Sequence, residues 1–552
     1  MQEELLELLR NPFAIISLSF LMSFCVVAGS QQLGDKVELE FLAYRMHQCE
    51  LSGNLYGSQN YKIHYEAVSL DSKTLRRCMV ATWRDVATRD VDAILSMSVG
   101  ALLIFIPSDL EALSPQDKQL FIDMEKRFLN EKTDLTVYVS PSTSNVPSIL
   151  SDIESTGDST ATATAQLLHS LTANTFQFTS VDSQPADVLN YKPNNIIARL
   201  GSGERSSPTI AFVAHYDSHA AFPGVAVGSD SNGSGIVALL ELLAILSPFY
   251  DKPSTKPQYN LVFVWTAGGK YNYQGARQFI DDFQEASQAN DEKLEVAICL
   301  DTVGGAGPLR MHASKAPSDE SAAGQLLKRL KAASPNKSIE LVTKKINLGA
   351  PLMSWEHERF NVRRMPAVTL SRLETSDQDS RKSLLDTPST VDVNSLMGNI
   401  RIIAEAVLGY MMPLTQADSG ANSDRQDRRV TADTQMLSKN SVDRHRVAHY
   451  IRQFATKPRP LADPEATGIV AQNIAAAARI YAVTTTMPVD LQEVRVWGVT
   501  KTRVLAERVK PAIFELVIAT VVLVYLYIFF FVISKSQRII ENSVTVMRKS
   551  VA

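Results

Sequence analysis

The central part of the chain alternates apolar runs with helical or loop sequence. Between Asn194 and Leu414 the runs are NNIIARL, TIAFVAH, YNLVFVWTA, LEVAICLDT and MPAVTLS, and each ends in a polar cluster. Strands that alternate with helices predict a largely parallel, doubly wound α/β sheet. The segment SGIVALLELLAIL, which begins at Ser234, is apolar on nearly every side and predicts a helix packed against that sheet.

The sequence on either side of this part is less regular. Residues 36–190 contain short alternations such as VELEFLAY, the apolar run GALLIFIP and a Ser/Thr-rich tract, which predict a mixed N-terminal region with exposed loops. Residues 417–435 are polar and predict an exposed linker. Between His445 and Lys510, stretches such as IVAQNIAAAARIYA predict helices that lead into the C-terminal segment.

Both ends of the chain are apolar. Leu516 to Ile533 carries no charge and, with Ile513 and Phe514, reaches the length of about 20 residues that spans a bilayer, so it predicts a single C-terminal transmembrane helix. Basic residues outnumber acidic ones after it, which favours a cytoplasmic tail and a lumenal or extracellular body. The run from Phe13 to Ala28 has the length of a signal peptide, and both a cleaved signal and a retained anchor fit it.

These patterns divide the chain into seven parts. They are a signal peptide or signal anchor (1–30), an N-terminal lumenal region (31–193), the α/β domain (194–415), a polar linker or loop (416–445), a helical membrane-proximal region (446–510), the transmembrane helix (511–534) and a cytoplasmic tail (535–552).

Composition narrows the class further. The formal net charge of -4 supplies no basic excess for phosphate neutralisation, so a nucleic-acid partner is not expected. Of the 4 cysteines, Cys25 and Cys299 lie in apolar runs. Cys49 and Cys78 remain, and either a disulfide that closes a loop of about 30 residues or two free thiols fits the sequence.

Candidate chemistry lies at the ends of the predicted strands, where open α/β sheets bind their ligands. TIAFVAH ends in His215-Tyr216-Asp217, and a period of two turns His215 and Asp217 to the same side. A His-x-Asp alone is weak evidence for a metal site. The clusters that follow in order are GSDSNGSG, VWTAGGKYNYQGAR, CLDTVGG and WEHERF.

This ordered series resembles the M28 family of zinc aminopeptidases over about 200 residues. The resemblance implies two zinc ions held by a His-x-Asp histidine, an aspartate before Asn-Gly/Ala-Ser-Gly, a Glu-Glu pair, a later aspartate and a late histidine. His215, Asp301 and His357 stand at matching positions.

The remaining positions of that pattern are lost. Ser231 replaces the bridging aspartate, and Gly268 and Gly269 replace the general base and a ligand. A catalytic zinc needs about three protein ligands, so we expect no catalytic residue, no metal and no cofactor, and we expect a pseudoenzyme.

Two alternatives stay open. Asp230, Glu356 and Glu358 lie beside the motif positions and could build a rearranged single-metal site in a membrane-anchored metallo-aminopeptidase. Alternatively, the cleft could bind a ligand without catalysis, with His215 and its polar neighbours satisfying one another.

The order of parts resembles the nicalin family, which is related to the secretase subunit nicastrin. This resemblance implies a type I protein of the endoplasmic reticulum membrane that acts as a scaffold in multipass membrane-protein biogenesis and receptor subunit assembly. The implied partners are a nodal-modulator-like membrane protein, a small multipass membrane protein, the translocon and multispanning receptor clients. Of the two glycosylation sequons we favour Asn336, in a polar stretch, and keep Asn232, in the motif loop, as the second candidate.

Overall fold

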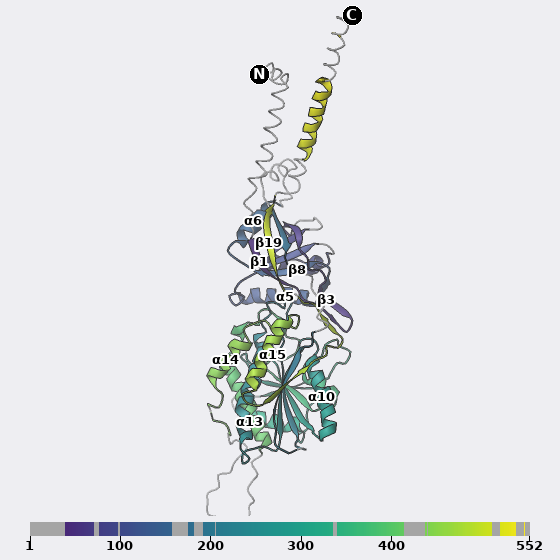
Figure 1. The fold of residues 1–552 in the computed structure, drawn as a ribbon. Helices are drawn as coiled ribbons and strands as arrows, with labels where there is room; N and C mark the ends of the chain where they lie inside the picture. The colour runs from purple at the N-terminus through teal and green to yellow at the C-terminus, as the bar shows by residue number, and fades with distance from the viewer. Residues whose placement is uncertain are drawn as a thin grey trace, which may run out of the picture.

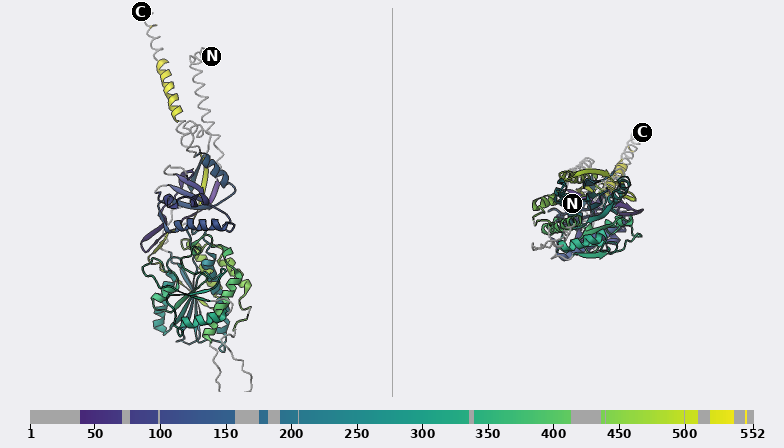
Figure 2. Two further views of the ribbon diagram at one scale, coloured as in Figure 1. Left: turned by 180° about the vertical axis from the view of Figure 1, so that it is seen from behind. Right: turned by 90° about the horizontal axis from the view of Figure 1, so that it is seen from below.

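The computed structural model describes most of the chain between residue 39 and the C-terminal helix. The described residues are 39–70, 77–97, 100–156, 175–181, 191–204, 206–334, 339–412, 436–438, 440–498, 500–509, 519–536 and 546. The predicted signal segment, most of the predicted linker and Asn336 lie outside them. Two units are stacked end to end, and the C-terminal helix lies beyond the upper one (Figure 1, Figure 2).

The lower unit, here called the sheet domain, is built on an eight-stranded sheet in the order β15-β14-β16-β13-β11-β12-β10-β17. Its strands are β10 (Asn194–Leu200), β11 (Thr209–His215), β12 (Asn260–Thr266), β13 (Leu294–Leu300), β14 (Arg310–Ala313), β15 (Glu340–Thr343), β16 (Ala367–Ser371) and β17 (Val483–Pro488). Strand β11 pairs in parallel with β12 and β13, and β13 with β16. The predicted α/β fold is confirmed, and each of the five apolar runs forms a strand.

Helices pack against this sheet because its central strands, such as β11 and β12, are apolar along nearly their whole length. They are α8 (Gly235–Leu246), α9 (Pro248–Asp251), α10 (Gln274–Asn290), α11 (Ala322–Ala333), α12 (His357–Val362), α13 (Val393–Met411), α14 (Arg444–Phe454) and α15 (Pro464–Ala478), with the short helices η1 (Ser229–Ser234), η2 (Asp379–Lys382) and η3 (Pro388–Thr390). Every residue of α8 is buried, as its all-apolar sequence predicts. Helices α14 and α15 contribute Val447 and Ile474 to the same core.

The upper unit, here called the barrel unit, is a closed barrel of seven strands in the order β1-β19-β9-β4-β5-β6-β8. These are β1 (Leu39–Arg45), β4 (His64–Val68), β5 (Cys78–Thr82), β6 (Ala101–Ile106), β8 (Thr136–Pro141), β9 (Thr175–Ser180) and β19 (Lys501–Val509). Its helices are α3 (Trp83–Ala87), α4 (Val91–Leu95), α5 (Pro115–Asn130) and α6 (Val146–Thr156). Helix α5 faces the sheet domain (Figure 1).

A small four-stranded sheet, β18-β2-β3-β7, lies beside the junction of the two units. Its strands are β2 (Gln48–Leu51), β3 (Asn54–Ser58), β7 (Lys132–Thr133) and β18 (Val494–Val496). The segment 446–510, expected to be helical, therefore also supplies one strand to each of the three sheets. In β19 the buried residues Thr502, Val504 and Ala506 alternate with more exposed ones, which is the period of a strand.

For Cys49 and Cys78, a disulfide and two free thiols are the alternatives that the sequence leaves open. Both residues are free, buried thiols, and so is Cys299. Cys78 lies in the core of the barrel with Phe178, whereas Cys49 packs on Tyr271 and Val496 beside the four-stranded sheet. The two cysteines occupy different sheets and different hydrophobic clusters.

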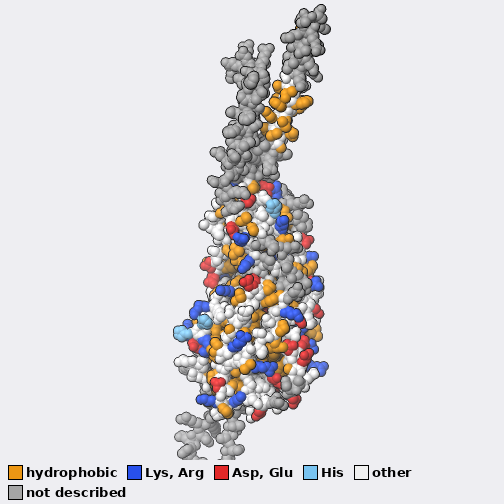
Figure 3. All heavy atoms as spheres, in the orientation of Figure 1, with side chains coloured by type: hydrophobic (Ala, Val, Ile, Leu, Met, Phe, Trp, Pro, Cys, Tyr) orange, Lys and Arg blue, Asp and Glu red, His pale blue; other side chains and the backbone are white. Residues whose placement is uncertain are grey.

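The C-terminal helix covers Ala519–Ser536 and is a candidate membrane span. Its mean hydropathy is 1.9, and none of it is buried within the described structure. Hydrophobic side chains cover it, whereas charged side chains of both signs are scattered over the units below (Figure 3). The longer apolar stretch Ser229–Asp251, which comprises η1, α8 and α9, is 89% buried and belongs to the core of the sheet domain.

Candidate functional site

The residues singled out in the sequence converge at the carboxyl ends of the central strands. His215 ends β11, the two glycines follow β12, and Asp301 follows β13. The loop of η1 and the loop that contains η2 close over them. His215 and Asp217 are 0% exposed and Asp301 and His357 are 1% exposed, so any charge here must be compensated within the protein.

Asp301 is compensated by an arginine. Its carboxylate forms an ion pair with Arg381 and accepts a hydrogen bond of 2.6 Å from the hydroxyl of Thr302. Burial alone would raise the pKa of Asp301, but the nearby positive charges, Arg381 above all, hold it well below its usual range. Arg381 also lies over the ring of Trp355, with 4.6 Å between the guanidinium carbon and the ring centroid. The guanidinium supplies positive charge to a carboxylate that the M28 pattern assigns to a metal.

A second cation lies at the lost bridging position. Lys270 Nζ donates to Ser231 Oγ at 2.6 Å and to the carbonyl oxygen of Arg381 at 2.9 Å. The lysine is only 6% exposed, and burial lowers its pKa to about 8. The position that the M28 pattern gives to a carboxylate is therefore a hydroxyl that accepts from an ammonium group.

The two glycines are fixed by their surroundings. Gly268 has a φ of +67°, and a Cβ on Gly269 would lie 2.2 Å from the Cβ of His215. The N–H groups of Gly269 and Lys270 donate to Asp217 at 2.7 Å and 2.9 Å. Asp217 therefore holds this loop, and the side chain of His215 leaves no room for a side chain at Gly269.

The Nδ1 atoms of the two histidines have different neighbours. His357 Nδ1 lies 2.8 Å from Thr369 Oγ1, and burial lowers the pKa of His357 to about 3, so its imidazole is neutral. His215 Nδ1 lies 3.8 Å from Glu356 Oε2. The Nε2 atoms of both histidines have no hydrogen-bond partner among the described residues.

Of the three carboxylates considered for a rearranged metal site, Asp230 and Glu358 are engaged by other groups. Glu356 accepts from Thr266 Oγ1 at 2.6 Å, and its Oε2 has no hydrogen-bond partner among the described residues. Asp230 accepts from the N–H of Gly304 at 2.7 Å and pairs with Arg372 at 2.6 Å. Glu358 accepts from the N–H of Ser354 at 3.1 Å. Within the described part of the chain, no group of three or more His, Cys, Asp or Glu side chains could hold a metal ion. The residues present do not fit the two zinc ions of the M28 pattern.

Sequence reasoning missed the two residues that dominate the charge of this site. Lys270 directly follows the glycine pair, so its position was a usable indication. Arg381 lies in the polar stretch SDQDSRKS, where nothing in the spacing distinguishes it from a surface arginine.

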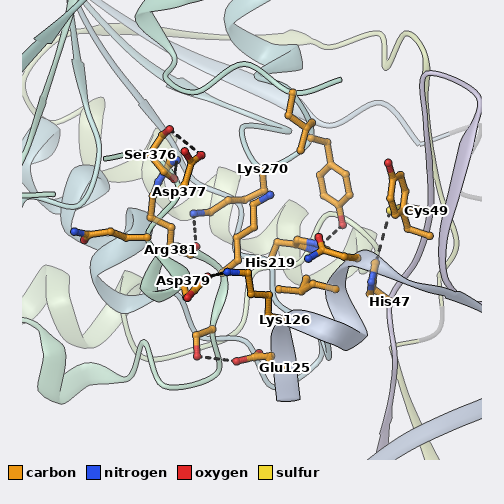
Figure 4. A pocket seen from close by; sticks show the side chains of 18 of the residues that line it. His47, Cys49, Glu125, Lys126, His219, Lys270, Ser376, Asp377, Asp379 and Arg381 are labelled. Carbon is orange, nitrogen blue, oxygen red and sulfur yellow. Dashed lines mark hydrogen bonds and ion pairs between the residues drawn. The ribbon is translucent and has the colours of Figure 1, made fainter. Parts of the chain in front are cut away.

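A cavity of about 340 Å³ opens beside these cations, at the junction of the two units. His47 and Cys49 from the four-stranded sheet side, Glu125 and Lys126 from α5, and Lys270 and Arg381 from the sheet domain all line it (Figure 4). Glu125 accepts from Ser383 Oγ at 2.7 Å and from the N–H of Leu384 at 3.0 Å, and these contacts join the two units. Burial raises the pKa of Glu125 to about 7.

Comparison with known proteins places this arrangement in a family. Residues 195–407 match the model of Peptidase family M28. Nicalin of Caenorhabditis elegans is 49% identical over the whole of both chains. The BOS complex subunit of Danio rerio is 30% identical over 96% of this chain and 95% of its own, and that of Homo sapiens is 35% identical over 68% and 69%.

Among solved structures, the γ-secretase component nicastrin aligns with a TM-score of 0.53 at 11% identity, over 85% of this chain and 99% of its own, which shows a shared fold. The resemblance predicted from the motifs is confirmed. The chain belongs to the nicalin family and carries a domain of the peptidase M28 type.

Proposed function

We propose that this protein is a non-catalytic scaffold subunit of a membrane protein complex. The observation that carries the proposal is a pair of buried cations: Lys270 donates to Ser231, which stands at the lost bridging position, and Arg381 pairs with the retained Asp301. An ammonium group at the bridging position opposes a divalent cation, and Gly268 and Gly269 offer no general base. The pseudoenzyme interpretation rests on these substitutions.

The cellular setting is part of the same proposal. Relatives at 30–36% identity are named as BOS complex subunits, which supports membership of a multiprotein complex. We infer a type I protein of the endoplasmic reticulum membrane, anchored by Ala519–Ser536, with both folded units in the lumen. Its proposed partners are a nodal-modulator-like membrane protein, a small multipass membrane protein and the translocon, and its proposed clients are multispanning receptors.

Affinity capture tests the scaffold role. The full chain, tagged and solubilised in mild detergent, should return a constant set of membrane proteins. An unrelated single-pass protein of the same membrane with the same tag is the control. Recovery of the chain alone under several mild detergents would contradict the proposal.

Metal analysis tests the missing chemistry separately. We expect no stoichiometric zinc and no peptidase turnover in the purified full chain. A full equivalent of zinc that is lost in the double variant H215A/D301A would instead support the alternative, a membrane-anchored metallo-aminopeptidase with a rearranged single-metal site.

A further inference from the structure

The cavity at the junction contains more positive charge than its acidic residues compensate. Among the acidic residues that line it, Asp379 pairs with Lys126 at 3.3 Å and Asp377 pairs with Lys344 at 3.6 Å. The carboxylate of Glu125 accepts hydrogen bonds from Ser383 Oγ and from the N–H of Leu384. None of these carboxylates is within ion-pair distance of the two lysines considered next.

Those two lysines are Lys270 and Lys382. Lys270 donates only to neutral oxygen atoms, as described above. The ammonium group of Lys382 lines the cavity and makes no hydrogen bond or ion pair with any residue that the structure describes. Burial and the adjacent Arg381 charge lower the pKa of Lys382 to about 8, although the charge of Asp377, which pairs with Lys344, opposes this shift.

The rest of the wall defines what else a ligand would meet. Leu51, Ile122, Leu129 and Leu352 supply apolar surface from both units. His219 also lines the cavity. Its Nδ1 lies 3.2 Å from the hydroxyl of Tyr271, and burial holds its pKa well below the usual value, so the imidazole is neutral. A volume of about 340 Å³ is at the small end of the range for small-molecule sites.

From this combination we propose that the cavity binds a carboxylate attached to an apolar group, with Lys382 as the ion-pairing residue and the leucine-lined wall holding the apolar part. The carboxylate would supply the anion that Lys382 lacks, in a site where charge-assisted hydrogen bonds are strong. A free organic acid and the C-terminal end of a peptide share this chemistry. The site involves no catalysis and does not depend on the identity of the membrane partners.

Calorimetric titration of the full chain in detergent tests the proposal with four probes. N-acetyl-leucyl-leucine and its C-terminal amide differ only in the carboxylate, as do 4-phenylbutyrate and its amide. We expect at least one acid to bind and its amide to bind at least about tenfold more weakly. Binding of both acids indicates that either source is accepted, whereas binding of one identifies the source.

Two variants locate the binding. K382M should weaken binding of the acid at least about tenfold, whereas K328M, which removes an exposed lysine outside the cavity lining, should leave affinity unchanged. L352W, which places an indole at another lining position, should also abolish binding, so that the result does not depend on one variant. Equal affinity for acid and amide, no binding of any probe, or unchanged affinity in K382M would overturn the proposal. K382M should still capture the same membrane partners as the wild type, so loss of acid binding in this variant is distinguished from loss of the scaffold role.

Discussion

The ion pair between Asp301 and Arg381 gives the sharpest test of how this site is stabilised. In the variant R381M the methionine fills part of the arginine volume but leaves Asp301 unpaired at 1% exposure. It also removes hydrogen bonds to Tyr273 Oη at 3.0 Å and to the carbonyl oxygen of Ser376 at 2.9 Å. Breaking a buried pair by removing one partner costs about 3–5 kcal/mol of unfolding free energy, because a buried charge is left uncompensated.

The assay is chemical denaturation of the full chain, followed by tryptophan fluorescence. Trp265 and Trp355 are both buried in the sheet domain, and Trp355 lies directly under Arg381, so these two of the four tryptophans report on this unit. The matched control is R363M, because Arg363 pairs with Asp281 at 2.9 Å with side chains 51% and 39% exposed. Removing that surface pair should cost no more than about 1 kcal/mol.

The double variant D301N/R381M completes the cycle. Asparagine carries no charge to leave uncompensated, so the double variant should recover a large part of the loss seen in R381M. If R381M and R363M are equally stable to within about 1 kcal/mol, or if the double variant is less stable than R381M, the charge of Asp301 does not need Arg381 and the reasoning is wrong.

Three further predictions concern other parts of the same framework. Burial raises the pKa of Glu125 from 4.5 to about 7, so the folded state binds its proton more tightly and stability falls as pH rises through this window. Between pH 4.5 and 7 the free energy of unfolding of the wild type should fall by about 3 kcal/mol relative to that of E125Q. Parallel pH profiles of the unfolding free energy for the two proteins would count against this. G269A should lower the melting temperature, because the new Cβ overpacks His215 at a cost of about 1–3 kcal/mol, whereas G468A in α15, with nothing within 4 Å, should raise it slightly. R446M should lower the free energy of unfolding by about 3 kcal/mol, because Glu241 is 0% exposed and accepts hydrogen bonds from Arg446 at 2.6 Å and 2.7 Å. A smaller loss of unfolding free energy than in R363M would refute this prediction.

The fold was predictable where a continuous run of apolar residues marks a buried strand or helix. The central strands are continuous apolar runs, and the helix after Ser234 is apolar all round, so periodicity identified them directly. Strands β14 and β15 have only four residues each, and β17 reads VTTTMP, so none has a distinctive pattern. The barrel was missed for a different reason. Its closure depends on the pairing of β1 with β19, more than 450 residues apart in the chain, for instance Leu39 with Ala506.

The candidate site was predictable only as a set of absences. Order along the strand ends identified His215, Asp301 and the losses at Ser231, Gly268 and Gly269, because strand ends in this fold meet at one edge. Which cation would compensate Asp301 could not be read from the sequence, since Arg381 is 80 residues from Asp301 and lies in a loop without periodicity.

The losses and the new charges form one arrangement. Glycine at position 269 lets the backbone lie against His215, where an added Cβ would be only 2.2 Å from the Cβ of His215. The same turn directs the N–H of Lys270 to Asp217 and its ammonium group to Ser231. A carboxylate at position 231 would pair with Lys270 in preference to a metal that has few other ligands, because the lysine is covalently present and already desolvated. The cations therefore do two things: they replace the charge that zinc would supply to Asp301, and they turn the neighbouring cavity electropositive.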